Sequence, residues 1–141
     1  MLVDSPAQVT LPLKPKESKC PPRNHRVRRI EKPWGHELVW AHTDRYVGKI
    51  LHVKAGERLS LQYHRVKDET IMLLSGRLMF EHYRDGEPPV STELAVREPF
   101  HISPGLRHRM IALEDCDIVE VSTPELDDVV RLEDKYGRSG G

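Results

Sequence analysis

The chain has 141 residues, which is enough for one domain with a single core but too few for two. Its 22 basic and 22 acidic residues leave no net charge, which argues against a protein that binds nucleic acid through bulk charge. No apolar run approaches the ~18–20 residues that cross a membrane, no signal peptide is evident, and two cysteines make a disulfide framework improbable, so a cytoplasmic protein is expected.

The N-terminal segment is rich in proline and basic residues. Its prolines are Pro6, Pro12, Pro15, Pro21 and Pro22. Proline denies a segment regular structure and the charges keep it solvated. We therefore expect residues 1–29 to form a disordered or extended arm, residues 30–138 one folded domain and residues 139–141 a flexible tail. An arm that crosses onto a partner subunit is the alternative to a solvated tail.

Short segments separated by turn signals follow. Strands are expected over residues 46–54, 59–64, 69–74, 77–84, 93–97, 100–103, 107–113 and 117–122, and only residues 125–134 show a weak helical pattern. Alternation in the first of these strands places Lys49 on the inward face, and Met72, Leu74, Leu78 and Phe80 read as core. Eight or nine short strands in about 100 residues, without an internal repeat, predict an all-β jelly-roll barrel.

Four residues with metal-binding side chains stand at suggestive spacing. Gln62, His64 and Glu69 lie between two glycines, and His108 follows in a later strand. Gln62 and His64 are two residues apart, so on a strand their side chains point to the same face. One amide, two imidazoles and one carboxylate can gather oxygen and nitrogen donors around a divalent cation.

The spacing of these residues resembles the two motifs of the cupin superfamily. The first motif is matched by Gly56, five residues, Gln62, one, His64, four, Glu69, six and Gly76. Gln62 stands where many cupins have histidine. In the second motif Gly105 and His108 fit, while the proline is displaced by one position to Pro104. The resemblance implies a single-domain cupin, a jelly-roll fold that hosts many activities.

Three stretches resemble a narrower family, the isomerase domain of bifunctional mannose-6-phosphate isomerase/GDP-mannose pyrophosphorylase enzymes. They are the LSLQ segment that ends at Gln62, the Lys32–Gly35 stretch KPWG, which resembles RPWG, and the closing segment 128–138, which resembles DDIVR…D.YGR. The resemblance covers roughly residues 30–138, and the chain has no room for the nucleotidyltransferase domain. It departs from the family at Lys32, where arginine is usual, and between His64 and Glu69, where the family reads HHHRAEHW.

This resemblance implies a metal-dependent aldose–ketose isomerase that converts mannose 6-phosphate to fructose 6-phosphate. One divalent ion, which could be Zn, Mn, Co, Ni or Fe, would be held by Gln62, His64, Glu69 and His108. The sugar phosphate would contact Lys49, which has a lysine counterpart in the family, and Arg131 and Arg138 of the closing segment. The alternatives are a rim position for Lys49 and salt bridges for the two arginines.

The catalytic base is not identified by the sequence. His101 and Glu81 are weak candidates, and either could be an ordinary surface residue. There are two competing hypotheses. One is a different enzyme on the same fold, either a non-haem iron oxygenase or an isomerase or epimerase that acts on another sugar. The other is a non-catalytic protein that binds a sugar or metabolite. Gln62 counts against the oxygenase, which usually has three histidines and one glutamate. Pairing through exposed sheet edges makes a homodimer plausible.

Overall fold

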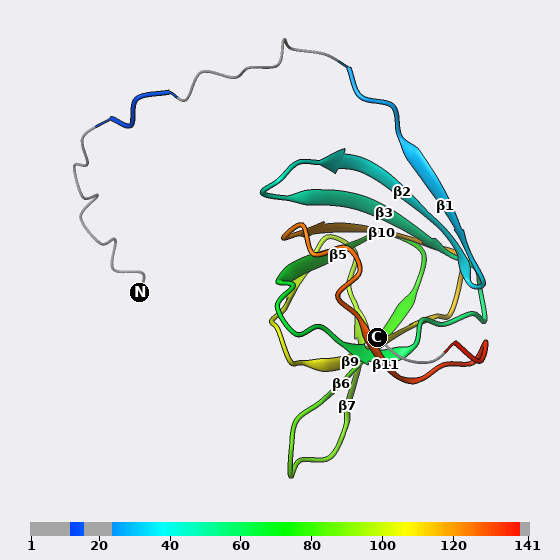
Figure 1. The fold of residues 1–141 in the computed structure, drawn as a ribbon. Helices are drawn as coiled ribbons and strands as arrows, with labels where there is room; N and C mark the ends of the chain where they lie inside the picture. The colour runs from blue at the N-terminus through cyan, green and yellow to red at the C-terminus, as the bar shows by residue number, and fades with distance from the viewer. Residues whose placement is uncertain (1–11, 16–23, 139–141) are drawn as a thin grey trace, which may run out of the picture.

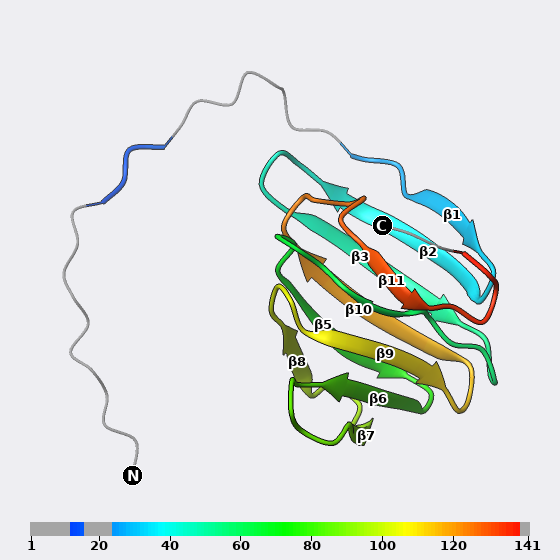
Figure 2. The same cartoon turned by 60° about the horizontal axis from the view of Figure 1, so that its bottom comes forward.

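Two antiparallel β-sheets face each other in the computed structural model, which describes residues 12–15 and 24–138 (Figure 1). The larger sheet has the order β1–β2–β3–β10–β5–β8: Arg28–Lys32, Gly35–His42, Val47–Val53, Cys116–Ser122, Glu69–Ser75 and Pro99–Ile102. The smaller sheet has the order β11–β4–β9–β6–β7: Val130–Glu133, Leu61–Tyr63, Arg107–Ala112, Leu78–Tyr83 and Val90–Leu94. The smaller sheet lies across the larger one (Figure 2). The expected all-β jelly-roll architecture is confirmed.

The ends of the domain differ from the expectation. β1 begins at Arg28, two residues before the expected boundary at residue 30, and most of the expected arm and the tail 139–141 lie outside the described residues. The expected helix over residues 125–134 is wrong, because this segment forms turns followed by β11. β11 pairs with β4, where Val130 lies opposite Tyr63. No helix in the described ranges is long and apolar enough to cross a membrane.

The core fills the space between the sheets. Its fully buried side chains include Ile71, Leu73, Phe80 and Ile118. The expectation that Met72 and Leu74 belong to the core is wrong: Met72 is partly exposed and Leu74 is exposed. Side chains alternate along a strand, so burial of Ile71 and Leu73 places Glu69 on the same inward face. The strand that completes the core thus also delivers a carboxylate into it.

The turn between β5 and β6 depends on Gly76. Its φ is +88°, and a Cβ built there would lie 2.1 Å from the carbonyl oxygen of Asp115. Gly86, between β6 and β7, has a φ of +75°, but no heavy atom lies within 4 Å of a Cβ built there. The two glycines share the left-handed backbone and differ in the space around them.

We therefore predict different costs for the same substitution at these two turns. Gly86→Ala should lower the free energy of unfolding by about 1–2 kcal/mol, from backbone strain alone. Gly76→Ala should cost a further ~1–3 kcal/mol, because the backbone of Asp115 has to move. Urea unfolding of both variants measures the difference, and equal costs would show that the close approach at Gly76 is easily relieved.

Candidate metal centre

Two neighbouring strands of the smaller sheet, one strand of the larger sheet and one loop bring the expected ligands together. Gln62 on β4 lies opposite His108 on β9, while Glu69 begins β5 and His64 follows β4 by one residue. One ligand atom from each of His64, Glu69 and His108 lies within 4.8 Å of the others. All three side chains are buried, with 3%, 3% and 1% of their surface exposed. These three residues could hold a metal ion.

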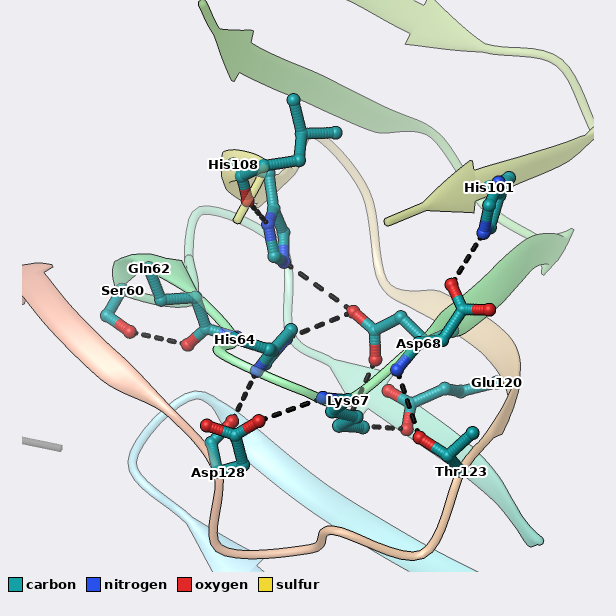
Figure 3. A network of polar contacts seen from close by, with 12 residues as sticks. Ser60, Gln62, His64, Lys67, Asp68, His101, His108, Glu120, Thr123 and Asp128 are labelled. Atoms are coloured by element: carbon teal, nitrogen blue, oxygen red, sulfur yellow. Dashed lines mark hydrogen bonds and ion pairs between the residues drawn. The ribbon is translucent and has the colours of Figure 1, made fainter. Parts of the chain in front are cut away.

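The hydrogen bonds of the two histidines fix which nitrogen faces the group. Nδ1 of His64 donates to the carbonyl oxygen of Asp128 at 2.6 Å, and Nδ1 of His108 donates to that of Leu106 at 2.8 Å (Figure 3). In the neutral imidazole each Nε2 then carries a lone pair. A ligating histidine commonly donates its other N–H to a backbone carbonyl in this way.

These lone pairs converge on a carboxylate. Nε2 of His64 lies 3.2 Å from Oε1 of Glu69, and Nε2 of His108 lies 3.6 Å from the same oxygen. Nε2 of His108 is buried without a hydrogen-bond partner. Burial lowers the pKa of His108, which favours the neutral form that binds metal. A divalent cation bound between the three atoms would satisfy both lone pairs and the carboxylate, so the residues present fit such an ion.

Gln62, the fourth expected ligand, lines the same cavity. Its side-chain oxygen accepts a hydrogen bond from the Ser60 hydroxyl at 2.7 Å. This bond orients the amide and leaves the oxygen a second lone pair. Its role as a ligand stays a prediction.

A buried lysine that the sequence analysis did not single out lies beside the ligands. Nζ of Lys67 is 3.0 Å from Oε2 of Glu69 and 3.1 Å from Oε2 of Glu120, and only 5% of the lysine is exposed (Figure 3). Burial alone would lower the pKa of Lys67, but the charges of Glu120 and Glu69 outweigh it and raise that pKa. The lysine is therefore held as a cation between two carboxylates.

The pKa values of the two carboxylates, Glu69 and Glu120, are shifted in opposite directions. Burial opposes the charge of Glu69, but the close contact with the His64 ring and the charge of Lys67 hold its pKa well below the usual range. Burial and the neighbouring charge of Glu69 raise the pKa of Glu120. Glu69 is thus ionised and ready to bind a cation, while Glu120 holds a proton more readily than an ordinary glutamate.

The loop that carries His64 and Lys67 is held by Asp128, from the segment between β10 and β11. Its carboxylate accepts the backbone N–H groups of Arg65, Val66 and Lys67 at 3.0, 2.7 and 2.9 Å. The bonds from Lys67 and Val66, with that from Arg65, lower the pKa of Asp128 to about 2. Because the carbonyl of the same residue orients the His64 ring, Asp128 positions both the ligand and its loop.

Gln62, His64 and Glu69 line a cavity of about 170 Å³ between the sheets, and His108 contacts Glu69 without being a lining residue. Its apolar lining includes Ile30, Trp34, Leu51 and Met110. Its basic lining residues are Arg28, Lys32, Lys49, Lys67 and Arg138. The cavity therefore combines apolar and charged lining residues, as small-molecule sites commonly do.

Two of the predicted substrate residues line this cavity. Lys49 points inward, as expected, and its Nζ lies 3.2 Å from Oε2 of Glu37, which is also buried. Arg138 pairs with Asp134, with 3.0 Å between Nε of the arginine and Oδ2 of the aspartate. Arg131, on β11 opposite Gln62, is not among the lining residues.

Neither predicted base lines the cavity. His101 is exposed on β8, and its Nε2 lies 2.6 Å from the carboxylate of Asp68 (Figure 3). Glu81 on β6 accepts a hydrogen bond from the hydroxyl of Tyr83 at 3.1 Å. β8 presents Ile102 inward, so alternation turns His101 outward, which agrees with the alternative of an ordinary surface residue.

Comparison with known proteins identifies the family. A family model described as "Mannose-6-phosphate isomerase C-terminal" matches residues 21–134. The chain belongs to this family. The mannose-1-phosphate guanylyltransferase of Escherichia coli (strain K12) is 34% identical over 120 residues, which is 81% of this chain and 24% of that protein. The chain thus spans about a quarter of the length of the curated relatives that it matches.

Solved structures agree on the fold. The capsular polysaccharide assembling protein CapF from Staphylococcus aureus superposes with a TM-score of 0.64 at 19% identity, over 78% of this chain and 35% of that one. Oxalate decarboxylase from Bacillus subtilis, which has Mn(II) centres, superposes with a TM-score of 0.66 at 13% identity, over 75% of this chain and 30% of that one. At such identities these structures support the cupin fold alone.

We predict that Asp128→Asn lowers metal affinity about 10–100-fold, because an amide has one acceptor oxygen for three N–H donors and leaves His64 less well oriented. Asp115→Asn is the matched control, since that carboxylate accepts the N–H of Ala55 at 2.7 Å, away from the ligands. Calorimetric titration with Zn²⁺ or Mn²⁺ measures the metal affinity of each variant. Equal metal affinities in the two variants would contradict a role of Asp128 in positioning the metal ligands.

Proposed function

We propose that this protein is a metal-dependent aldose–ketose isomerase of sugar phosphates, acting on mannose 6-phosphate and fructose 6-phosphate. The observation that carries the proposal is the convergence of His64, Glu69 and His108 beside buried Lys67 and Glu120, at a cavity that all of these residues except His108 line. Membership of the mannose-6-phosphate isomerase C-terminal family supports the choice of substrate.

The reaction moves a proton between C1 and C2 of the open-chain sugar, and a hydroxyl proton between O1 and O2, through an enediol. A divalent ion held by His64, Glu69 and His108, with Gln62 as the predicted fourth ligand, would polarise the sugar oxygens as a Lewis acid. The remaining needs fall to the chain itself, which has to exclude water, orient the sugar and supply a base.

The cavity lining supplies groups for these tasks. Trp34, Leu51 and Met110 provide an apolar wall that excludes water. We assign the proton transfer to Glu120, because it is a lining carboxylate one lysine away from Glu69 and is not itself among the predicted ligands. Lys49, neutralised by Glu37, is placed to donate a hydrogen bond to a sugar oxygen.

The test is turnover of mannose 6-phosphate by metal-stripped protein, repeated after separate addition of Zn²⁺, Mn²⁺, Co²⁺ and Ni²⁺. We expect one cation to restore turnover, and His64→Ala to lower kcat at least about 100-fold. His42→Ala, which removes an exposed histidine at the end of β2, is the control and should be active.

Two results would contradict the proposal. Turnover that survives both chelation and His64→Ala would exclude a metal-dependent reaction at this site. Tight binding of mannose 6-phosphate without turnover under any of the four cations would replace the isomerase with a sugar-binding protein.

A further inference from the structure

The basic residues that line the cavity are not equally neutralised. Lys49 pairs with Glu37, Lys67 with Glu69 and Glu120, and Arg138 with Asp134. Arg28 and Lys32 line the same cavity, and within the ranges 12–15 and 24–138 neither forms an ion pair with a carboxylate. The cavity therefore has two basic side chains whose charge is left for a ligand.

Both of these side chains come from β1, the edge strand of the larger sheet. Arg28, Ile30 and Lys32 are alternate residues, so they share one face of the strand, and all three line the cavity. Arg29 and Glu31 occupy the opposite face and pair with each other at 2.6 Å. Alternation thus separates a neutralised outer pair from an uncompensated inner pair on the same strand.

Arg138 lines the cavity from the C-terminal segment, which passes close to β1 and β2 in Figure 2. Asp134 accepts hydrogen bonds from Nε and Nη2 of Arg138, at 3.0 Å each, which fixes the guanidinium in place. Asp127 is the lining carboxylate that takes no part in these ion pairs. It is exposed, as Arg28 is, so salt and water screen both charges, whereas Lys32 is partly buried.

The ligand that matches this arrangement is a phosphate monoester. It carries about −1.5 to −2 charge at pH 7 and offers three acceptor oxygens, which two or three separate cations can share. An arginine fork binds phosphate through two parallel hydrogen bonds, and lysine adds a point charge on a flexible stem. Three of the predicted metal ligands, Gln62, His64 and Glu69, also line the cavity, so the reacting end of a sugar and its phosphate would meet different groups.

We propose that Arg28 and Lys32 of β1 form the phosphate subsite of this cavity, with Arg138 completing it. The inference rests on the proposed function for the identity of the sugar, but not for the presence of an anion site. It assigns the inner face of β1, at the edge of the fold, a direct part in substrate binding.

The experiment is calorimetric titration of the metal-loaded protein with inorganic phosphate. Arg28→Ala and Lys32→Ala should each weaken phosphate binding about 10–100-fold, the range for loss of a charged hydrogen bond. Arg29→Ala is the matched control: it removes the same charge from the same strand but on the outer face, so its affinity should stay within about twofold of the wild type. Lys32→Arg should restore most of the loss.

A second readout separates this proposal from the isomerase proposal. If the protein turns over mannose 6-phosphate, both β1 variants should raise KM while metal content is unchanged. Turnover with unaltered KM and unaltered phosphate affinity would overturn the phosphate subsite and leave the isomerase standing. Phosphate binding that depends on Arg28 and Lys32 in a protein without turnover would support the phosphate subsite and contradict the isomerase proposal. Equal losses in all three alanine variants would reduce the effect to general charge and overturn the subsite.

Discussion

The structure depends on a buried carboxylate that two imidazole lone pairs approach. Glu69 reaches the space between the sheets because it shares the inward face of β5 with Ile71 and Leu73. The hydrogen bonds that His64 and His108 donate to backbone carbonyls leave the lone pair of each Nε2 directed at that carboxylate. Such a group is unfavourable in a low-dielectric interior unless a positive charge compensates it, so the fold itself favours a bound cation.

Lys67 supplies part of that compensation, and it links Glu69 on β5 to Glu120 on the neighbouring strand β10. By pairing with both Glu69 and Glu120, it allows two carboxylates to be buried close together. The loop that carries it is fixed by Asp128, which lies more than 60 positions further along the chain. Ligand, lysine and base candidate are therefore held by long-range hydrogen bonds rather than by one local motif, and their geometry depends on the whole barrel being folded.

The sequence predicts the ligand group better than its surroundings. The glycine-framed spacing anticipates His64, Glu69 and His108, because strand periodicity and the family motif agree there. β1 was missed because most of its residues are charged, and its pairing with β2 rather than an apolar pattern makes it a strand. Glu120 could have been noticed as an acid on the inward face of its strand, whereas the contact of Asp128 with the 65–67 loop follows only from tertiary structure.

X-ray absorption spectroscopy of the protein loaded with one equivalent of Co²⁺ tests the central claim most directly, because imidazole rings give a distinct multiple-scattering signal. We predict two imidazole ligands per cobalt in the wild type and one in His108→Ala. A spectrum with oxygen ligands alone, or one that His108→Ala leaves unchanged, would contradict a metal centre built from His64, Glu69 and His108.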